Sequence, residues 1–163
     1  MGRRLLVLAS ALLVFAACSS GSAGGGAKDV PAGASYKALD GSSATLASYK
    51  GTPVLVNFFS STCEPCVKEM PALEKVKQEA AGKVRFVGID VGDTLPATTS
   101  FVDAVKVTWD IGRDPDAAFA GALGATALPT TFVLDADGKV VYQHLGQLDV
   151  DQLRSELTSR GLL

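Results

Sequence analysis

Two cysteines, Cys63 and Cys66, stand two residues apart in this sequence, and their type and spacing suit redox chemistry. An apolar run with strand composition over 54–59 ends in small polar residues just before them, and a helical pattern begins at Cys63. The free N–H groups and the positive dipole end of a helix terminus stabilise a thiolate on Cys63. Cys66 lies one helical turn further on and can close a small disulfide ring. We therefore predict a reactive pair; the alternative is an inert buried disulfide or two core thiols.

Strand and helix patterns alternate around this pair. Strand patterns cover 36–46 (as a hairpin), 53–59, 83–91, 107–111, 128–134 and 139–145. Helical patterns cover 46–50 (a single turn), 63–81, 97–106, a helix opened by Asp114 and Pro115, and a closing helix to about 160. Asp149 or Asp151 is expected to begin that closing helix. The alternation predicts an α/β sandwich with a mixed central sheet and a short N-terminal hairpin.

The helix that follows Cys63 shows one apolar face. Val67, Met70, Leu73 and Val76 recur at a spacing of three, so we expect all four to be buried. Pro71 lies inside this pattern and is expected to kink the helix.

The N-terminal part of the chain reads as export and tethering sequence. Residues 1–17 combine Arg3 and Arg4 with an apolar run that ends in small residues, which is typical of a secretory signal peptide. The segment Phe15-Ala16-Ala17-Cys18 resembles a bacterial lipobox, in which Cys18 becomes the lipidated first residue. The alternative is a plain secreted protein whose Cys18 is lost with the signal. Residues 18–34 read as a flexible Gly/Ser/Ala tether, and 35–163 as one domain.

Charge and cysteine content exclude several kinds of function. The net charge is −2 and there is no basic cluster in the domain, so we expect no nucleic-acid partner. Three cysteines are too few for a disulfide scaffold. A structural zinc site needs about four ligands, and beyond the cysteine pair the chain offers only His144. We therefore expect no metal, no cofactor and a monomer, with His144 an ordinary half-exposed sheet residue.

The motifs together resemble the extracytoplasmic thioredoxin-like proteins of the TlpA/ResA type. The resemblance rests on Cys63-Glu64-Pro65-Cys66 after a Val-Leu-Val-Asn-Phe strand, on Glu69 and Pro71 in the same helix, and on Leu128-Pro129-Thr130-Thr131-Phe132 before a hairpin. It covers about 31–161, including an inserted helix and strand around 93–113. It implies a thioredoxin-like three-layer fold and a membrane-tethered thiol-disulfide oxidoreductase. Its partners would be exported protein thiols or disulfides and a membrane redox donor or acceptor.

The resemblance also implies roles for single residues. Cys63 would attack and Cys66 would resolve the mixed disulfide. Pro129 would be cis and border the substrate groove, although a trans proline opening an edge strand is the alternative. Glu69 matches a ResA-type glutamate that could exchange a proton with Cys66, the alternative being a solvated surface charge. Asp93 falls where ResA-type proteins carry a second acid, and capping a helix is its alternative.

Two residues between the cysteines are expected to tune the pair. Glu64 places a negative charge beside Cys63, which opposes the thiolate and favours the disulfide, and Pro65 completes the ResA-like motif. Thioredoxin itself has a buried aspartate where this chain has Asn57, which cannot relay a proton, so Glu69 gains weight as the proton carrier. We favour a reductant, for instance in cytochrome c maturation, over a dithiol oxidase on the same scaffold.

Two other classes of function fit the sequence less well. A peroxiredoxin would have Pro and Thr where this chain has Val56 and Ser60. A copper chaperone of thioredoxin-like fold would need a wider cysteine spacing and a matching histidine, whereas His144 stands in the last strand pattern.

Overall fold

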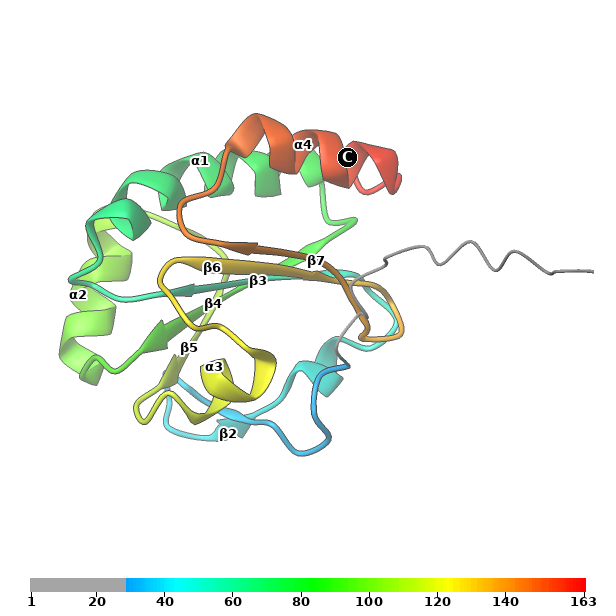
Figure 1. Ribbon diagram of the computed structural model, residues 1–163. Helices are drawn as coiled ribbons and strands as arrows, with labels where there is room; N and C mark the ends of the chain where they lie inside the picture. Colours follow the sequence, from blue (N-terminus) through cyan, green and yellow to red (C-terminus); the bar gives the residue numbers. More distant parts are fainter. Residues whose placement is uncertain (1–28) are drawn as a thin grey trace, which may run out of the picture.

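The computed structural model describes residues 29–163, which form a seven-stranded sheet with helices on both faces (Figure 1). The predicted signal peptide, the predicted lipid site Cys18 and most of the predicted tether lie outside the described residues. The strand order is β2-β1-β5-β4-β3-β6-β7. Strands β3, β4 and β5 run parallel, and the other pairings are antiparallel. The predicted α/β fold with a mixed sheet and an N-terminal hairpin is confirmed.

The elements have the following bounds. The strands are β1 Tyr36–Ala38, β2 Ser43–Ala44, β3 Val54–Phe59, β4 Arg85–Val91, β5 Asp110–Asp114, β6 Thr130–Leu134 and β7 Val140–Leu145. The helices are the 3-10 turn η1 Leu46–Tyr49 and the α-helices α1 Glu64–Ala80, α2 Leu95–Val105, α3 Ala118–Leu123 and α4 Val150–Ser159. In Figure 1, α1 and α4 cover one face of the sheet and α3 lies on the other, so the domain has three layers.

Strand β3 lies in the centre of the sheet, and all six of its side chains are buried. It pairs in parallel with β4 and antiparallel with β6, so that Phe58 lies opposite Thr130 and Phe59 opposite Asp90. The ends of β3 and β4 and the start of β6 therefore meet at one edge of the sheet. This edge is where the chain leaves β3 for the cysteine pair.

Helix α1 begins directly after Cys63, which is its N-cap residue, and Pro65 stands in its first turn. Its buried residues are Cys66, Glu69, Met70, Leu73, Glu74, Val76 and Ala80. The prediction that Val67 belongs to this face is wrong, because its exposed fraction is 42%. The buried face of α1 begins one residue earlier, at Cys66. It also includes Glu69, which a search for apolar residues misses because its side chain is polar.

Two predicted boundaries are also wrong. The strand expected over 107–111 lies at Asp110–Asp114, where charged residues conceal the strand pattern, and Trp109 is buried before it. The helix expected to open at Asp114 begins at Ala118. The Asp114 carboxylate nevertheless accepts hydrogen bonds from the N–H groups of Phe119 (3.1 Å) and Ala120 (2.8 Å). Although it lies at the end of β5, it thus supplies an acceptor to the N–H groups in the first turn of α3. The predicted start of the closing helix at Asp149 is confirmed.

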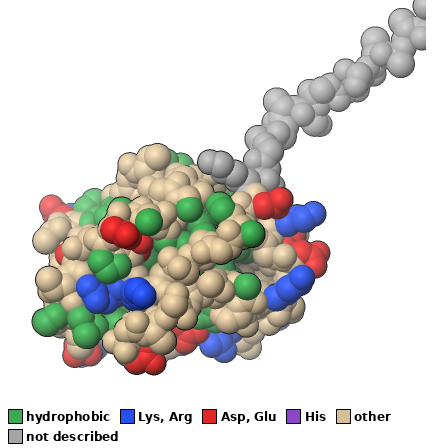
Figure 2. All heavy atoms as spheres, turned by 90° about the horizontal axis from the view of Figure 1, so that it is seen from below, with side chains coloured by type: hydrophobic (Ala, Val, Ile, Leu, Met, Phe, Trp, Pro, Cys, Tyr) green, Lys and Arg blue, Asp and Glu red, His purple; other side chains and the backbone are tan. Residues whose placement is uncertain are grey.

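The face seen in Figure 2 carries acidic, basic and hydrophobic side chains interspersed with one another. Among residues 29–163, none of the helices combines the length and the apolar character needed to cross a membrane.

Candidate active site

Cys63 and Cys66 form a disulfide at the junction of β3 and α1. The two sulfur atoms are 2.05 Å apart and the two Cα atoms 5.3 Å apart. The Cys66 side chain is fully buried, whereas Cys63 is partly exposed. The Cys66 N–H also points at the Cys63 sulfur, at 3.3 Å. An incoming thiol or disulfide can therefore reach Cys63 first, at a position where a helix N-terminus favours negative charge.

Glu64 projects into solvent and pairs with Lys68 one turn along the helix, with 2.7 Å between carboxylate oxygen and ammonium. This hydrogen bond and the lysine charge lower the pKa of Glu64. Glu64 is thus ionised beside Cys63, as the tuning hypothesis requires, but Lys68 offsets part of its charge. Because both side chains are largely exposed, water screens the pair, and its influence on the thiolate is modest.

Pro129 lies at the same edge of the sheet, directly before β6, and the Leu128–Pro129 peptide bond is cis. The residue after it, Thr130, pairs with Phe58 near the end of β3. The Pro129 carbonyl accepts a hydrogen bond from the Gly146 N–H at 2.8 Å, which ties this turn to the loop that follows β7.

Glu69 is buried beneath the pair, with an exposed fraction of 2%, so the alternative of a solvated surface charge is wrong. One carboxylate oxygen accepts a hydrogen bond from Asn57 Nδ2 at 2.8 Å, and the other accepts one from the Leu148 N–H at 2.9 Å. Asn57 Nδ2 also donates to Thr131 Oγ1 at 3.0 Å. Burial raises the pKa of Glu69, and the bonds from Leu148 and Asn57 offset part of that effect. A carboxyl group whose pKa is raised in this way is a better partner for a thiol proton than a solvated carboxylate is.

Asp93 binds the loop that leads to Cys63 and does not cap a helix. Its Oδ2 accepts a hydrogen bond from the Ser61 N–H at 2.6 Å, whereas Thr94 is the N-cap residue of α2. Burial opposes the charge of Asp93, but the bonds from Ser61 outweigh it, so the pKa of Asp93 is lowered. Asp93 thus holds the turn before the cysteine pair, and the capping alternative is wrong.

Asp90, which is not among the predicted site residues, lies behind Asp93 at the end of β4 and is fully buried. Its Oδ1 accepts a hydrogen bond from the Asp93 N–H at 3.3 Å. Burial and then the neighbouring Asp93 charge raise the pKa of Asp90 to about 7. The available signal was an aspartate inside the apolar strand pattern Val-Gly-Ile-Asp-Val.

Replacing Asp90 with asparagine is expected to change how stability depends on pH. Because the folded-state pKa is raised, ionised Asp90 penalises the folded protein, and wild-type stability should fall as pH rises from about 4 to about 8. The Asp90→Asn variant has no charge to bury. Its free energy of unfolding should therefore rise relative to that of the wild type by about 2 to 4 kcal/mol as the pH goes from about 4 to about 8. Urea unfolding at several pH values measures the difference. The exposed Asp103→Asn variant is the control, and a pH-independent difference for Asp90→Asn would contradict the assignment.

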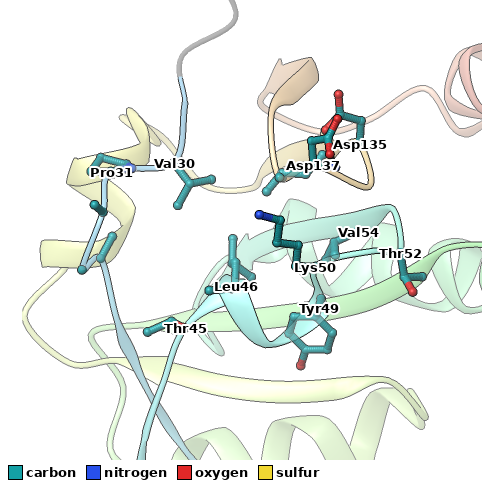
Figure 3. Close-up of a pocket in the computed structure, with 16 residues that line it drawn as sticks. Val30, Pro31, Thr45, Leu46, Tyr49, Lys50, Thr52, Val54, Asp135 and Asp137 are labelled. Carbon is teal, nitrogen blue, oxygen red and sulfur yellow. Dashed lines mark hydrogen bonds between the residues drawn. The ribbon is translucent and has the colours of Figure 1, made fainter.

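Among residues 29–163, no group of three or more His, Cys, Asp or Glu side chains is placed to hold a metal ion. A pocket of about 280 Å³ lies near Val54, at the opposite end of β3 from the cysteine pair (Figure 3). Lys50 points within it toward the turn that carries Asp135 and Asp137. This pocket is therefore separated from the cysteine pair by the length of β3.

Comparisons with known proteins identify the family of the chain. The family model described as Redoxin matches residues 26–158. The ResA thiol-disulfide oxidoreductase of Bacillus thuringiensis (strain Al Hakam) is 33% identical over 120 residues, which span 73% of this chain and 69% of the relative. The thioredoxin-like protein YneN of Bacillus subtilis (strain 168) is 31% identical over 126 residues, 76% of this chain and 74% of the relative.

The fold is similar to that of a solved structure described as MTB dsbF in its mixed oxidized and reduced forms. That structure is 28% identical, with a TM-score of 0.70, and the match covers 79% of this chain and 94% of that one. The family match, the ResA relative and the cysteine pair at disulfide distance agree with one another. The chain therefore belongs to the Redoxin family and is a thioredoxin-like thiol-disulfide oxidoreductase of the TlpA/ResA type.

Proposed function

We propose that this protein is a lipid-tethered, extracytoplasmic reductant of disulfides in exported proteins, such as apocytochromes c awaiting haem attachment. The observation that best supports the thiol chemistry is the difference in exposure between the two cysteines at the start of α1. Cys63 is partly exposed, whereas Cys66 is fully buried. The signal-like residues 1–17 and the lipobox-like Cys18 support the location. Residues 18–34 would tether the domain, and a membrane dithiol donor would return the protein to its reduced form.

In the proposed reaction the Cys63 thiolate attacks one sulfur of the substrate disulfide. A mixed disulfide forms and the first substrate thiolate leaves. Glu69 then takes the proton of the Cys66 thiol, and the Cys66 thiolate attacks the Cys63 sulfur, releasing the second substrate thiolate. Two electrons pass to the substrate, and the Cys63–Cys66 disulfide is formed. Pro129, beside the end of β3, would present backbone to an extended substrate segment.

The residues around the pair would set its direction and geometry. Glu64 beside Cys63 would favour the disulfide form and so the reductant role, with Pro65 completing the tuning motif. Asp93 would fix the position of Cys63 indirectly, because it accepts the Ser61 N–H and so holds the turn that ends at Cys63.

Equilibration with a glutathione redox buffer tests the direction. A reductant should have a potential nearer that of thioredoxin, about −270 mV, than that of a strong periplasmic oxidant, about −120 mV. Glu64→Gln should move the potential by about 10 to 20 mV toward the oxidising side, and Lys68→Gln should move it the other way, because each removes one member of the ion pair. A wild-type potential near the oxidising value would instead identify a dithiol oxidase.

A further inference from the structure

A row of polar side chains crosses the face of the sheet that α1 and α4 cover, from the core to the outermost strand β7. Asn57 on β3 lies opposite Thr131 on β6, and Thr131 lies opposite His144 on β7, the last strand of the sheet. Directly paired residues project from the same face of a sheet, so the three side chains follow one another. Asn57 and Thr131 are fully buried, whereas His144 is half-buried. The row thus runs from the Glu69 carboxylate towards solvent.

A single peptide group joins His144 to Glu69. His144 Nε2 lies 3.1 Å from the carbonyl oxygen of Gln147, and the Leu148 N–H donates to Glu69 Oε2 at 2.9 Å. That carbonyl and that N–H are the two ends of the Gln147–Leu148 peptide. When His144 Nε2 carries a proton and donates it to the carbonyl, the peptide is polarised and its N–H becomes a stronger donor to the carboxylate.

His144 is one of the groups that affect the pKa of Glu69. Burial raises the pKa of Glu69, while the Leu148 N–H, the Asn57 amide and the positive charge of His144 each lower it. Strands β3 and β6 contribute only Asn57 and Thr131 to this row, and neither titrates. Helix α1 itself contributes Cys66, whose thiol titrates once the disulfide is reduced.

The other charged groups on β7 and α4 either bind other partners or carry negative charge. On β7, two residues before His144, burial and the carboxylates of Glu156 and Asp149 raise the pKa of Tyr142. On α4, Arg154 donates to Glu79 at 2.8 Å and to Asp151 at 2.9 Å. Asp149 accepts the first N–H groups of α4. Within the described residues, His144 is therefore the side chain whose positive charge, when it is protonated, lowers the pKa of Glu69.

We infer that His144 is a positioning residue for Glu69: it holds the Gln147–Leu148 peptide against the carboxylate, and its positive charge favours the ionised form that accepts the Cys66 proton. This inference rests on the proposed role of Glu69. No proton leaves His144 in the step; the proton passes from Cys66 to Glu69, and the Cys66 thiolate displaces the substrate thiolate from Cys63.

Three substitutions separate the position of the peptide from the charge. His144→Gln keeps a donor for the Gln147 carbonyl and loses the charge, His144→Arg keeps both, and His144→Ala loses both. The exposed neighbour Gln143, which points to the opposite face of β7, supplies the control variant Gln143→Ala. Two readouts on the full-length protein are needed. One is the ¹³C NMR titration of the Glu69 carboxyl group, and the other is the rate at which Cys66 releases a thiol from a preformed Cys63 mixed disulfide.

At about pH 6, His144→Ala is expected to slow the resolving step about threefold to tenfold and to move the Glu69 titration to higher pH. His144→Gln should show the same direction with a smaller effect, and His144→Arg should behave like the wild type. In a Glu69→Gln background, His144→Ala should have no further effect on the rate. The inference is overturned if the Glu69 titration does not move, or if His144→Ala slows the reaction equally without Glu69. If Glu69→Gln alone leaves the rate unchanged, the proposed proton carrier fails, while the NMR titration still decides whether His144 acts on Glu69.

Discussion

Replacing Cys63 with serine is expected to abolish disulfide reduction, lowering kcat/KM by at least about a thousandfold. A serine hydroxyl is not ionised at neutral pH, so the helix start that stabilises a thiolate has no comparable nucleophile to act on. Cys66 cannot substitute, because its side chain is fully buried behind Cys63. Reduction of insulin or of a fluorogenic disulfide peptide measures the loss.

A matched variant tests whether the effect belongs to the thiol. Ser61→Ala changes a neighbouring side chain in the same turn, while its backbone N–H remains bonded to Asp93. This control should keep most of the activity. Near-normal turnover by Cys63→Ser would mean that the reactive sulfur lies elsewhere.

The second large effect is expected for Glu69→Gln, which should slow the resolving step about a hundredfold at neutral pH. The first attack by Cys63 should keep its rate, because Glu69 lies beneath Cys66 on the buried face of α1. The wild-type rate should rise with pH as Glu69 ionises, and the variant should lose that rise. Stopped-flow measurements of the two successive thiol releases separate the steps.

The substitution is compatible with the fold. A glutamine can accept the Leu148 N–H, and a turn of the Asn57 amide by half a rotation would bring Asn57 Oδ1, which has no hydrogen-bond partner within the described residues, to face the glutamine amide in place of Nδ2. Since burial raises the pKa of Glu69, the ionised carboxylate penalises the folded protein, so the variant should gain stability over the wild type as pH rises. Glu79→Gln, on the exposed side of the same helix, is the control. Equal slowing of both thiol releases would show general damage and no proton transfer by Glu69.

The position of the cysteine pair was predictable from the sequence because it depends on local signals. A continuous apolar strand, small polar residues and a proline in the first helical turn specify the junction of β3 and α1 within one short stretch. The same kind of signal located the β6 and β7 hairpin through Asp137-Gly138.

The surroundings of the pair were not predictable in the same way, because they depend on packing between distant residues. The sequence marks Asn57 only as a residue that cannot relay a proton, yet it donates to Glu69 across the interface of β3 and α1. Asp90 is not among the predicted site residues, and His144 is expected to be an ordinary sheet residue, although register places it beside Thr131. These contacts require knowing which strands are neighbours, which a single sequence does not state.

The wrong predictions for Val67 and for the bounds of β5 also arise because packing between distant residues decides these features. Val67 fits a spacing of three, but the direction of the helix face is set by which residues contact the sheet, and Cys66 and Glu69 take those positions. Strand β5 carries Asp110, Arg113 and Asp114, so pairing with β4 outweighs its weak intrinsic strand pattern.

The most direct test of the account is to trap the mixed disulfide. Full-length Cys66→Ser protein, reduced and then mixed with a disulfide-bearing peptide, cannot resolve the intermediate, so the peptide should remain attached. Mass spectrometry of proteolytic fragments is predicted to find it on Cys63, and Cys63→Ser protein should trap none. Accumulation of the adduct on Cys66 in the Cys63→Ser variant, with none in Cys66→Ser, would contradict the assignment of attacking and resolving thiols.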